Sequence, residues 1–120
     1  MSPFAGVRVL VVEDEGAIAM MIEEMLDEFG CEVVASVARL VTALEIASSA
    51  EIDLAILDVN LAGERVFPVA EILRDRGIPM VFSTGYGASG LPSDFAQHLV
   101  LHKPFSQSAL QQKVALALRR

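Results

Sequence analysis

The stretch VRVLVVED, residues 7–14, decides the fold of this chain, because an apolar run there ends in two acids. The run from Val7 to Val12 is broken only by Arg8, is too short for a helix and is rich in valine, so it predicts a buried strand. Four further segments, residues 32–36, 52–57, 79–83 and 98–102, predict four more strands. Strands that are apolar throughout are typical of a parallel sheet buried on both faces.

The segments between these strands have a helical period. One helical face carries apolar residues at Ile18, Met21, Ile22, Met25, Leu26 and Phe29, and Gly30 predicts the end of this helix. Further helices are predicted at residues 39–49, from Pro68 to about Arg76, and from the N-cap Ser106 to the end. Strands that alternate with helices predict right-handed crossovers and a parallel sheet covered on both faces.

Length and composition indicate one globular domain over residues 1–120. The chain is 53% hydrophobic and 21% charged, and its net charge is −7. This charge argues against direct nucleic-acid binding, because no basic stripe is available. No apolar run is long enough to span a bilayer, the start MSPFAG has no export signal, and the single Cys31 suits a reducing compartment. We therefore expect a cytoplasmic protein that contacts neither a membrane nor nucleic acid.

Polar residues stand where the predicted strands stop. Glu13 and Asp14 follow the first strand, Asp58 the third, Thr84 the fourth and Lys103 the fifth. Ligands of open parallel sheets bind beyond the carboxyl ends of the strands. We therefore expect these five side chains to share one cleft.

The residue types in this cleft favour phosphoryl chemistry. Close carboxylates repel one another unless a cation joins them, and Mg²⁺ prefers carboxylate oxygens together with waters and a phosphate oxygen. Asp58 is a candidate nucleophile, because carboxylates form aspartyl-phosphates. Lys103 and Mg²⁺ would neutralise the transferring group, while Thr84 could donate a hydrogen bond to it. Each residue alone also has an ordinary structural explanation: Asp58 in a turn or helix cap, the acids of residues 13–15 at a solvated helix start, and Lys103 in a loop. Their joint placement at the strand ends favours the shared cleft.

The chain resembles the receiver domains of two-component response regulators over essentially its whole length. The resemblance rests on Val11-Val12-Glu13-Asp14-Glu15, Leu57-Asp58-Val59-Asn60, Ser83-Thr84-Gly85 and Lys103-Pro104-Phe105. It implies a flavodoxin-like (βα)5 fold, a doubly wound α/β architecture with a parallel five-stranded sheet in the order 2-1-3-4-5. It also implies a signalling domain rather than an enzyme. The phosphoryl donor would be a phosphohistidine on a histidine kinase or a histidine phosphotransfer protein.

The same resemblance implies a role for each residue at the strand ends. Asp58 would be the phosphoacceptor, and Thr84 and Lys103 would bind the phosphoryl group. The Lys103-Pro104 peptide bond would be cis. The implied Mg²⁺ ligands are Asp14, directly, Glu13, often through water, Asp58, and the backbone carbonyl of Asn60.

One motif narrows the resemblance. The sequence from Phe82 to Gly87, Phe-Ser-Thr-Gly-Tyr-Gly, is similar to the Phe-Ala-Thr-Gly-Tyr signature of FATGUY-type receivers. These are common as single-domain proteins in alphaproteobacteria and as receivers attached to HWE-type kinases. Val100 stands where most receivers carry a switch Tyr or Phe. Residues 85–92 hold three Gly and one Pro, so any helix after the fourth predicted strand should be short and late, and we expect this segment to order on activation with Tyr86 as an anchor.

Three other functions fit parts of the pattern. A phosphatase of the haloacid-dehalogenase type would need a second Asp two residues after Asp58, where Asn60 stands. A flavodoxin-like FMN carrier would need Ser, Thr and Gly in its first loop, where the acids of residues 13–15 would repel phosphate. A pseudo-receiver that binds partners without phosphorylation is the alternative function, although the set of acids, Thr and Lys is complete.

Three residues have simpler interpretations. His98 and His102 flank the fifth predicted strand, and a structural role is expected for each. Met20 points away from the apolar face of its helix, which leaves a contact with a partner open.

Overall fold

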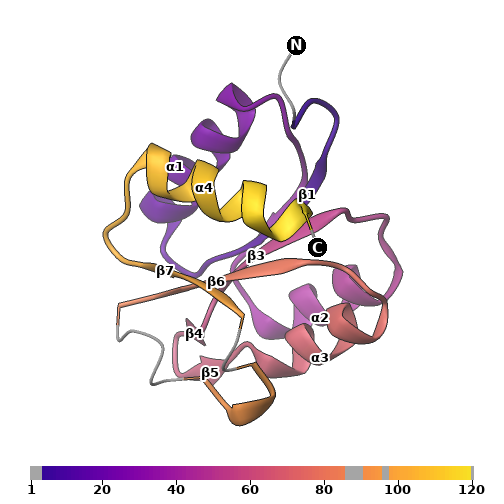
Figure 1. Cartoon of the computed structure of the whole chain (residues 1–120). Coiled ribbons are helices and arrows are strands. Elements are labelled where there is room, and N and C mark those ends of the chain that lie inside the picture. Colours follow the sequence, from indigo (N-terminus) through magenta and orange to yellow (C-terminus); the bar gives the residue numbers. More distant parts are fainter. Residues whose placement is uncertain (1–3, 86–90, 96–97, 120) are drawn as a thin grey trace.

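A five-stranded parallel sheet forms the centre of the molecule in a computed structural model that describes residues 4–85, 91–95 and 98–119 (Figure 1). The sheet order is β2-β1-β3-β6-β7, which confirms the predicted order of the five strands. The strands are β1 (Arg8–Val12), β2 (Glu32–Val37), β3 (Leu54–Asp58), β6 (Met80–Thr84) and β7 (Leu99–His102).

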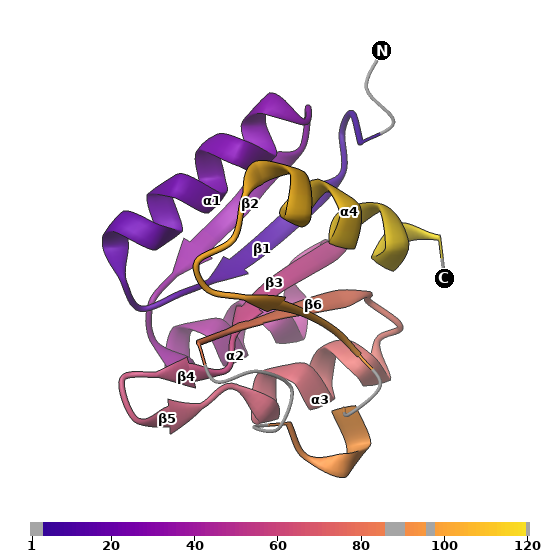
Figure 2. The ribbon, with the colours of Figure 1, turned by 60° about the vertical axis from the view of Figure 1, so that its left-hand side comes forward.

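Helices cover both faces of the sheet, so the chain has the expected flavodoxin-like α/β architecture. In Figure 2 the sheet lies between α1 (Gly16–Glu28) with α4 (Gln107–Leu118) on one side and α2 (Leu40–Ser49) with α3 (Phe67–Asp75) on the other. The start of α4 has the predicted cap, because the Ser106 hydroxyl accepts a hydrogen bond from the Ala109 N–H. No helix in the described part of the chain combines the length and apolar character that a membrane crossing requires.

The apolar runs of the inner strands β1, β3 and β6 are continuous because these strands are buried on both sides, whereas the edge strand β2 is half-buried or exposed along its length. On β1, Val9 and Val11 pack toward α1 and α4, whereas Leu10 and Val12 pack toward α2 and α3. The alternation of side chains along a strand therefore feeds two separate cores, one on each face of the sheet. On the inner strands β3 and β6, polar side chains appear only at the carboxyl ends, at Asp58, Ser83 and Thr84.

The loop expected around Gly63 contains a small hairpin that the sequence analysis did not predict. Strands β4 (Asn60–Leu61) and β5 (Glu64–Arg65) pair antiparallel through a two-residue turn. Both turn residues, Ala62 (φ 52°) and Gly63 (φ 93°), have left-handed backbones, as tight hairpin turns require. Prediction missed it because Ala at the first turn position is not the usual Asn or Asp signal.

The connection from β6 to β7 holds a single 3-10 turn, η2 (Ser93–Phe95), among its described residues. Phe95 is buried there, with its ring stacked on Phe67 at 5.7 Å between centroids. This turn matches the expectation of a short helix in a Gly-rich connection. Residues 86–90 lie outside the described part of the chain, so the predictions about Tyr86 and about ordering of this segment stay predictions.

The two histidines and Met20 lie where the sequence suggested. His98 precedes β7 and packs edge-on against Phe82 and Phe95. His102 is the last residue of β7 and pairs in register with Thr84. Met20 is 61% exposed on α1.

Candidate phosphoryl and metal site

The fold brings the five predicted polar residues to one edge of the sheet. Asp58 is the last residue of β3 and Thr84 the last of β6, while the acids follow β1 and Lys103 follows β7. They meet at a hollow of about 240 Å³, whose described lining is Asp14, Glu15, Asp58, Asn60, Ala62, Thr84, Gly85 and Lys103. Glu13 lies beneath it, only 2% exposed. The predicted shared cleft is therefore present.

Three carboxylates form the acidic part of the cleft. One carboxylate oxygen from each of Glu13, Asp14 and Asp58 lies within 4.8 Å of the others. Glu13 and Asp58 are buried and Asp14 is half-buried, so the group faces solvent through Asp14. Hard oxygen donors in a partly open cluster suit Mg²⁺, which keeps several waters when it binds proteins. The donor set thus fits the expected metal.

Lys103 balances part of this negative charge. Its ammonium Nζ lies 2.8 Å from Glu13 Oε1 and 3.3 Å from Asp58 Oδ2. The peptide bond that follows it, Lys103-Pro104, is cis as predicted. The Lys103 N–H also donates a hydrogen bond to the Thr84 carbonyl, which ties the lysine to the end of β6.

The carboxylates change the acidity of their neighbours. Burial raises the pKa of Asp58 to about 7, helped by the charge of Glu13 and by hydrogen bonds with Asp14 and Glu13, while Lys103 acts in the opposite direction. Burial acts to lower the pKa of Lys103, but its bond to Glu13 and the charge of Asp58 outweigh burial and raise it. Without a metal, the cleft therefore favours a charged lysine beside a carboxyl group that holds a proton near neutral pH.

Backbone groups hold the carboxylates in place. The Asn60 N–H donates to Asp58 Oδ1 at 3.3 Å, and the Glu15 N–H donates to Glu13 Oε2 at 3.1 Å. The Asn60 side chain serves the hairpin instead, because its Oδ1 accepts a hydrogen bond from the Gly63 N–H at 2.8 Å. The hairpin therefore fixes Asn60, the residue expected to offer its backbone carbonyl, two residues after Asp58.

Ser83 is a polar residue of this edge to which the sequence gave no role. It is 1% exposed, and its hydroxyl has no hydrogen-bond partner among the described residues. Leaving a buried hydroxyl unpaired costs about 1–3 kcal/mol of stability. The sequence offered one signal, a Ser where the similar signature has Ala, but only the register of the strands shows where this side chain lies.

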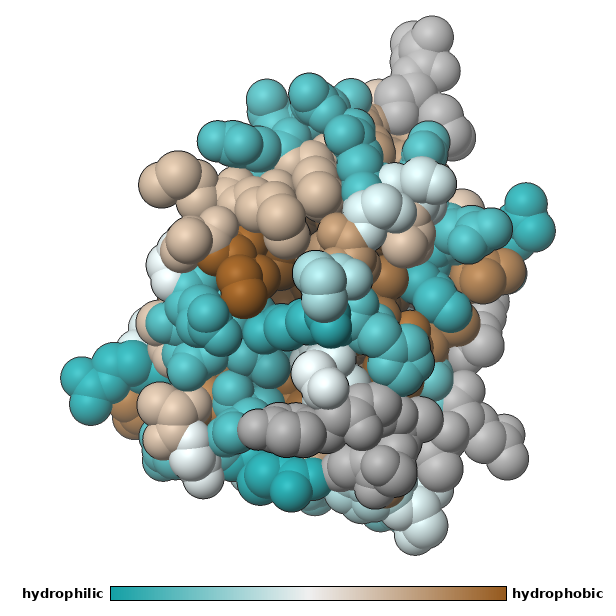
Figure 3. Space-filling view, turned by 90° about the vertical axis from the view of Figure 1, so that its left-hand side faces the viewer, coloured by the Kyte–Doolittle hydropathy of each residue, from teal (hydrophilic) through white to brown (hydrophobic). Residues whose placement is uncertain are grey.

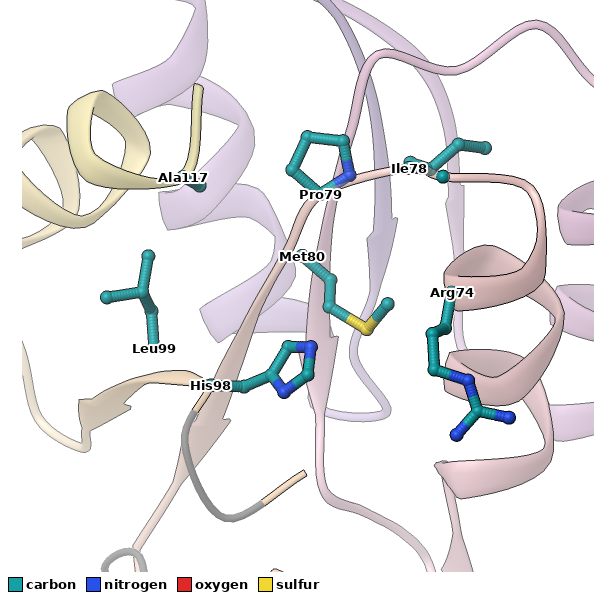
Figure 4. Close-up of a pocket in the computed structure, with 8 residues that line it drawn as sticks. Arg74, Ile78, Pro79, Met80, His98, Leu99 and Ala117 are labelled. Carbon is teal, nitrogen blue, oxygen red and sulfur yellow. The ribbon is translucent and has the colours of Figure 1, made fainter. Parts of the chain in front are cut away.

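Three further hollows lined by described residues lie outside the cleft, and one of them, of about 570 Å³, is bordered by Met20, Glu23 and Asp27 of α1. An apolar groove of about 370 Å³ borders Lys103, with Ile18, Met21, Pro104 and Phe105 in its lining; Figure 3 shows hydrophobic side chains gathered on this face beside hydrophilic ones. The third hollow, of about 280 Å³, lies at the amino ends of β6 and β7, where Figure 4 shows Met80 between Arg74 and His98. Its described lining has no carboxylate and therefore does not suit a metal or a phosphoacceptor.

Comparisons with known proteins point to one family. The family model for the response regulator receiver domain matches residues 9–115. The transcriptional regulatory protein PdtaR of Mycobacterium tuberculosis is 35% identical over 117 residues, which cover 94% of this chain and 57% of that protein. The chain thus spans little more than half the length of this relative.

Two solved structures are similar over nearly the whole chain. The solution structure of SdrG from Sphingomonas melonis Fr1 has 42% sequence identity and a TM-score of 0.85, with 100% of both chains covered. The BeF3-activated conformation of SdrG from Pseudomonas melonis Fr1 has 41% identity and a TM-score of 0.80, covering 95% of this chain and 98% of that one.

Proposed function

The chain belongs to the response regulator receiver domain family, and we propose that it is an active phosphoacceptor of a two-component phosphorelay, with Asp58 as the acceptor. The observation that carries this proposal is the position of Asp58 in the cleft. Its carboxylate lies in a three-acid cluster, 3.3 Å from the ammonium of Lys103. A nucleophile, an acidic metal site and a fixed cation are the parts that phosphoryl transfer to an aspartate needs.

The transfer step follows from these parts. A carboxylate oxygen of Asp58 attacks the phosphorus of a phosphohistidine, the P–O bond forms, the P–N bond breaks, and the imidazole keeps the electron pair and takes up a proton. Lys103 stabilises the negative charge on the phosphoryl oxygens, and Thr84 lies at the same hollow to donate a hydrogen bond. Glu13, Asp14, Asp58 and the Asn60 carbonyl would hold Mg²⁺, which would supply positive charge that keeps Asp58 ionised.

The partner that we propose is a histidine kinase or a histidine phosphotransfer protein. The apolar groove formed by Ile18, Met21, Pro104 and Phe105 lies beside Lys103, so a helix seated there would bring a phosphohistidine near Asp58. The BeF3-activated state of a relative with 41% identity supports a phosphorylation-dependent response. We also propose that residues 1–120 act as one receiver of the FATGUY type; its cytoplasmic location and an alphaproteobacterial source stay predictions.

The switch is proposed to work without a rotating aromatic residue. Val100 is 9% exposed and packs in the core between the sheet and the α2–α3 layer. Valine has no aromatic ring that could rotate into the core on activation. The response would then pass from Thr84 into the connection that follows it, toward Phe95.

Phosphorylation by a small donor tests the proposal. Wild type mixed with acetyl phosphate and Mg²⁺ should gain the mass of one phosphoryl group and shift on a Phos-tag gel, and Asp58→Asn should show neither change. Asp53→Asn is the matched control, because it removes a carboxylate from the other end of the same strand. An unmodified wild type would instead support a pseudo-receiver that binds partners without phosphorylation.

A further inference from the structure

Ser83 lies in the same row of side chains as the proposed phosphoacceptor. In the parallel pairing of β3 with β6, Asp58 is the register partner of Ser83, and on the other side Ser83 pairs with Leu101 of β7. Residues paired in register point to the same face of a sheet. Two residues earlier on β6, Val81 packs toward α1 and α4, so Ser83 and Asp58 both face that side.

The side chain of Lys103 must pass this serine. Lys103 follows β7, but its ammonium reaches Asp58 on β3 and Glu13 after β1. The sheet order places β6 between β7 and β3. The lysine side chain therefore crosses the end of β6, where Ser83 is the residue on the same face as Asp58.

In the described structure the Lys103 ammonium contacts the carboxylates of Glu13 and Asp58. The ammonium lies 2.8 Å from Glu13 and 3.3 Å from Asp58, whereas the Ser83 hydroxyl, 1% exposed, has no hydrogen-bond partner among the described residues. A hydroxyl can accept a hydrogen bond, and an ammonium has three to donate. The Ser83 hydroxyl is thus a buried acceptor close to the side chain of Lys103, whose ammonium is bound to Glu13 and Asp58 instead.

We propose that Ser83 is a positioning residue for Lys103, whose ammonium it holds in the metal-loaded, phosphorylated state. The inference rests on the proposed function, because phosphorylation and a cation at the acids both weaken the pull of Glu13 and Asp58 on the lysine. Lys103 then donates to the phosphoryl oxygens and to the Ser83 hydroxyl. The hydroxyl does not line the hollow over Asp58, so it acts on the reaction through Lys103.

Removing this hydroxyl should have opposite effects in the two states. Ser83→Ala deletes an unpaired buried group from the metal-free protein, so its melting temperature should rise by a few degrees. In the presence of Mg²⁺ and acetyl phosphate, the same variant loses an acceptor for a charged donor, and its phosphorylation rate should fall about tenfold. Ser83→Thr keeps the hydroxyl and should recover most of the rate.

A spectroscopic measurement separates positioning from simple stability. The chain has two lysines, Lys103 and Lys113, so lysine-selective isotope labelling gives one NMR signal to follow and one internal reference. Phosphorylation should move the Lys103 side-chain signal in wild type and in Ser83→Thr, and move it differently in Ser83→Ala. The Lys113 signal should be the same in all three proteins.

The outcomes distinguish this inference from the function beneath it. If wild type is phosphorylated and Ser83→Ala matches it in rate and in the Lys103 signal, the positioning role is overturned even if the melting temperature rises. If wild type takes up no phosphoryl group at all, the proposed function and this inference fall together. A slower Ser83→Ala with an altered Lys103 signal supports both.

Discussion

Two aspartates at opposite ends of β3 have opposite acid–base behaviour. Asp53, just before the strand, accepts hydrogen bonds from the Arg8 guanidinium at 3.0 and 3.1 Å and from the Arg8 N–H at 2.9 Å. These bonds lower the pKa of Asp53. Asp58, the last residue of the strand, is buried beside another acid, and its pKa is raised to about 7. Asp53 and Asp58 are only five positions apart, yet the fold pairs the first carboxylate and leaves the second short of positive charge.

The different charge environments of Asp53 and Asp58 show how one sheet can be stable at one end and reactive at the other. At the amino end Arg8 pairs with Asp53 and with the exposed Glu51, and solvent reaches all three side chains, so these charges need no further partner. At the carboxyl end, a single lysine faces two buried carboxylates and a third nearby. A cluster with excess negative charge is stabilised when a cation binds to it. The incomplete end is therefore where a ligand has something to contribute.

The largest expected effect comes from removing the only ammonium that contacts these acids in the described structure. Lys103→Met leaves Glu13 and Asp58 buried without that partner, so the metal-free protein should lose roughly 3–5 kcal/mol of unfolding free energy near neutral pH. Urea denaturation with EDTA measures the loss. Lys113→Met, on α4, is the control and should change little. Equal stability of the Lys103→Met and Lys113→Met variants would mean that the carboxyl end of β3 does not depend on the positive charge of Lys103.

The next effect is the pH dependence of Asp58. Because its pKa in the folded protein is about 7, above the ordinary value of 3.8 for an aspartate, its contribution to stability is complete below about pH 4 and is lost as pH rises through 7. In EDTA, Asp58→Asn should therefore be more stable than wild type by roughly 2–4 kcal/mol at about pH 8. The difference should vanish at about pH 4, as urea melts across this range would show.

Magnesium should offset part of that destabilisation of the wild type. Binding to the folded state alone raises stability by about 1.4 kcal/mol when the free metal is at ten times its dissociation constant. The melting temperature of wild type should accordingly rise with Mg²⁺ in the millimolar range. Asp14→Asn should lose this shift, and Asp53→Asn should keep it. If the wild-type melting temperature does not change with Mg²⁺, the acidic cluster is not a metal site.

The contrast between the two ends was only partly readable from the sequence. The five polar residues could be found because each follows a segment that had already been assigned as a strand, and parallel strands end together. The hairpin could not be found, because Ala62 adopts a left-handed backbone without a sequence signal for it. Nor could the burial of Ser83 beside Asp58, since it depends on the register of β6 with both of its neighbouring strands.

The smallest expected effect belongs to the satisfied end of the strand. Asp53 has a pKa below its ordinary value, so its contribution to stability is present above about pH 4 and is lost as pH falls through the lower value in the folded protein. Because the pair with Arg8 is well over a third exposed, solvent screening limits that contribution. Asp53→Asn should lower stability at neutral pH by about 1 kcal/mol or less, and by nothing measurable in strong acid. Its pH dependence should run opposite to that of Asp58→Asn. Melts of the two variants in one pH series compare them directly, and slopes of the same sign would show that the two ends of β3 do not differ in the way proposed.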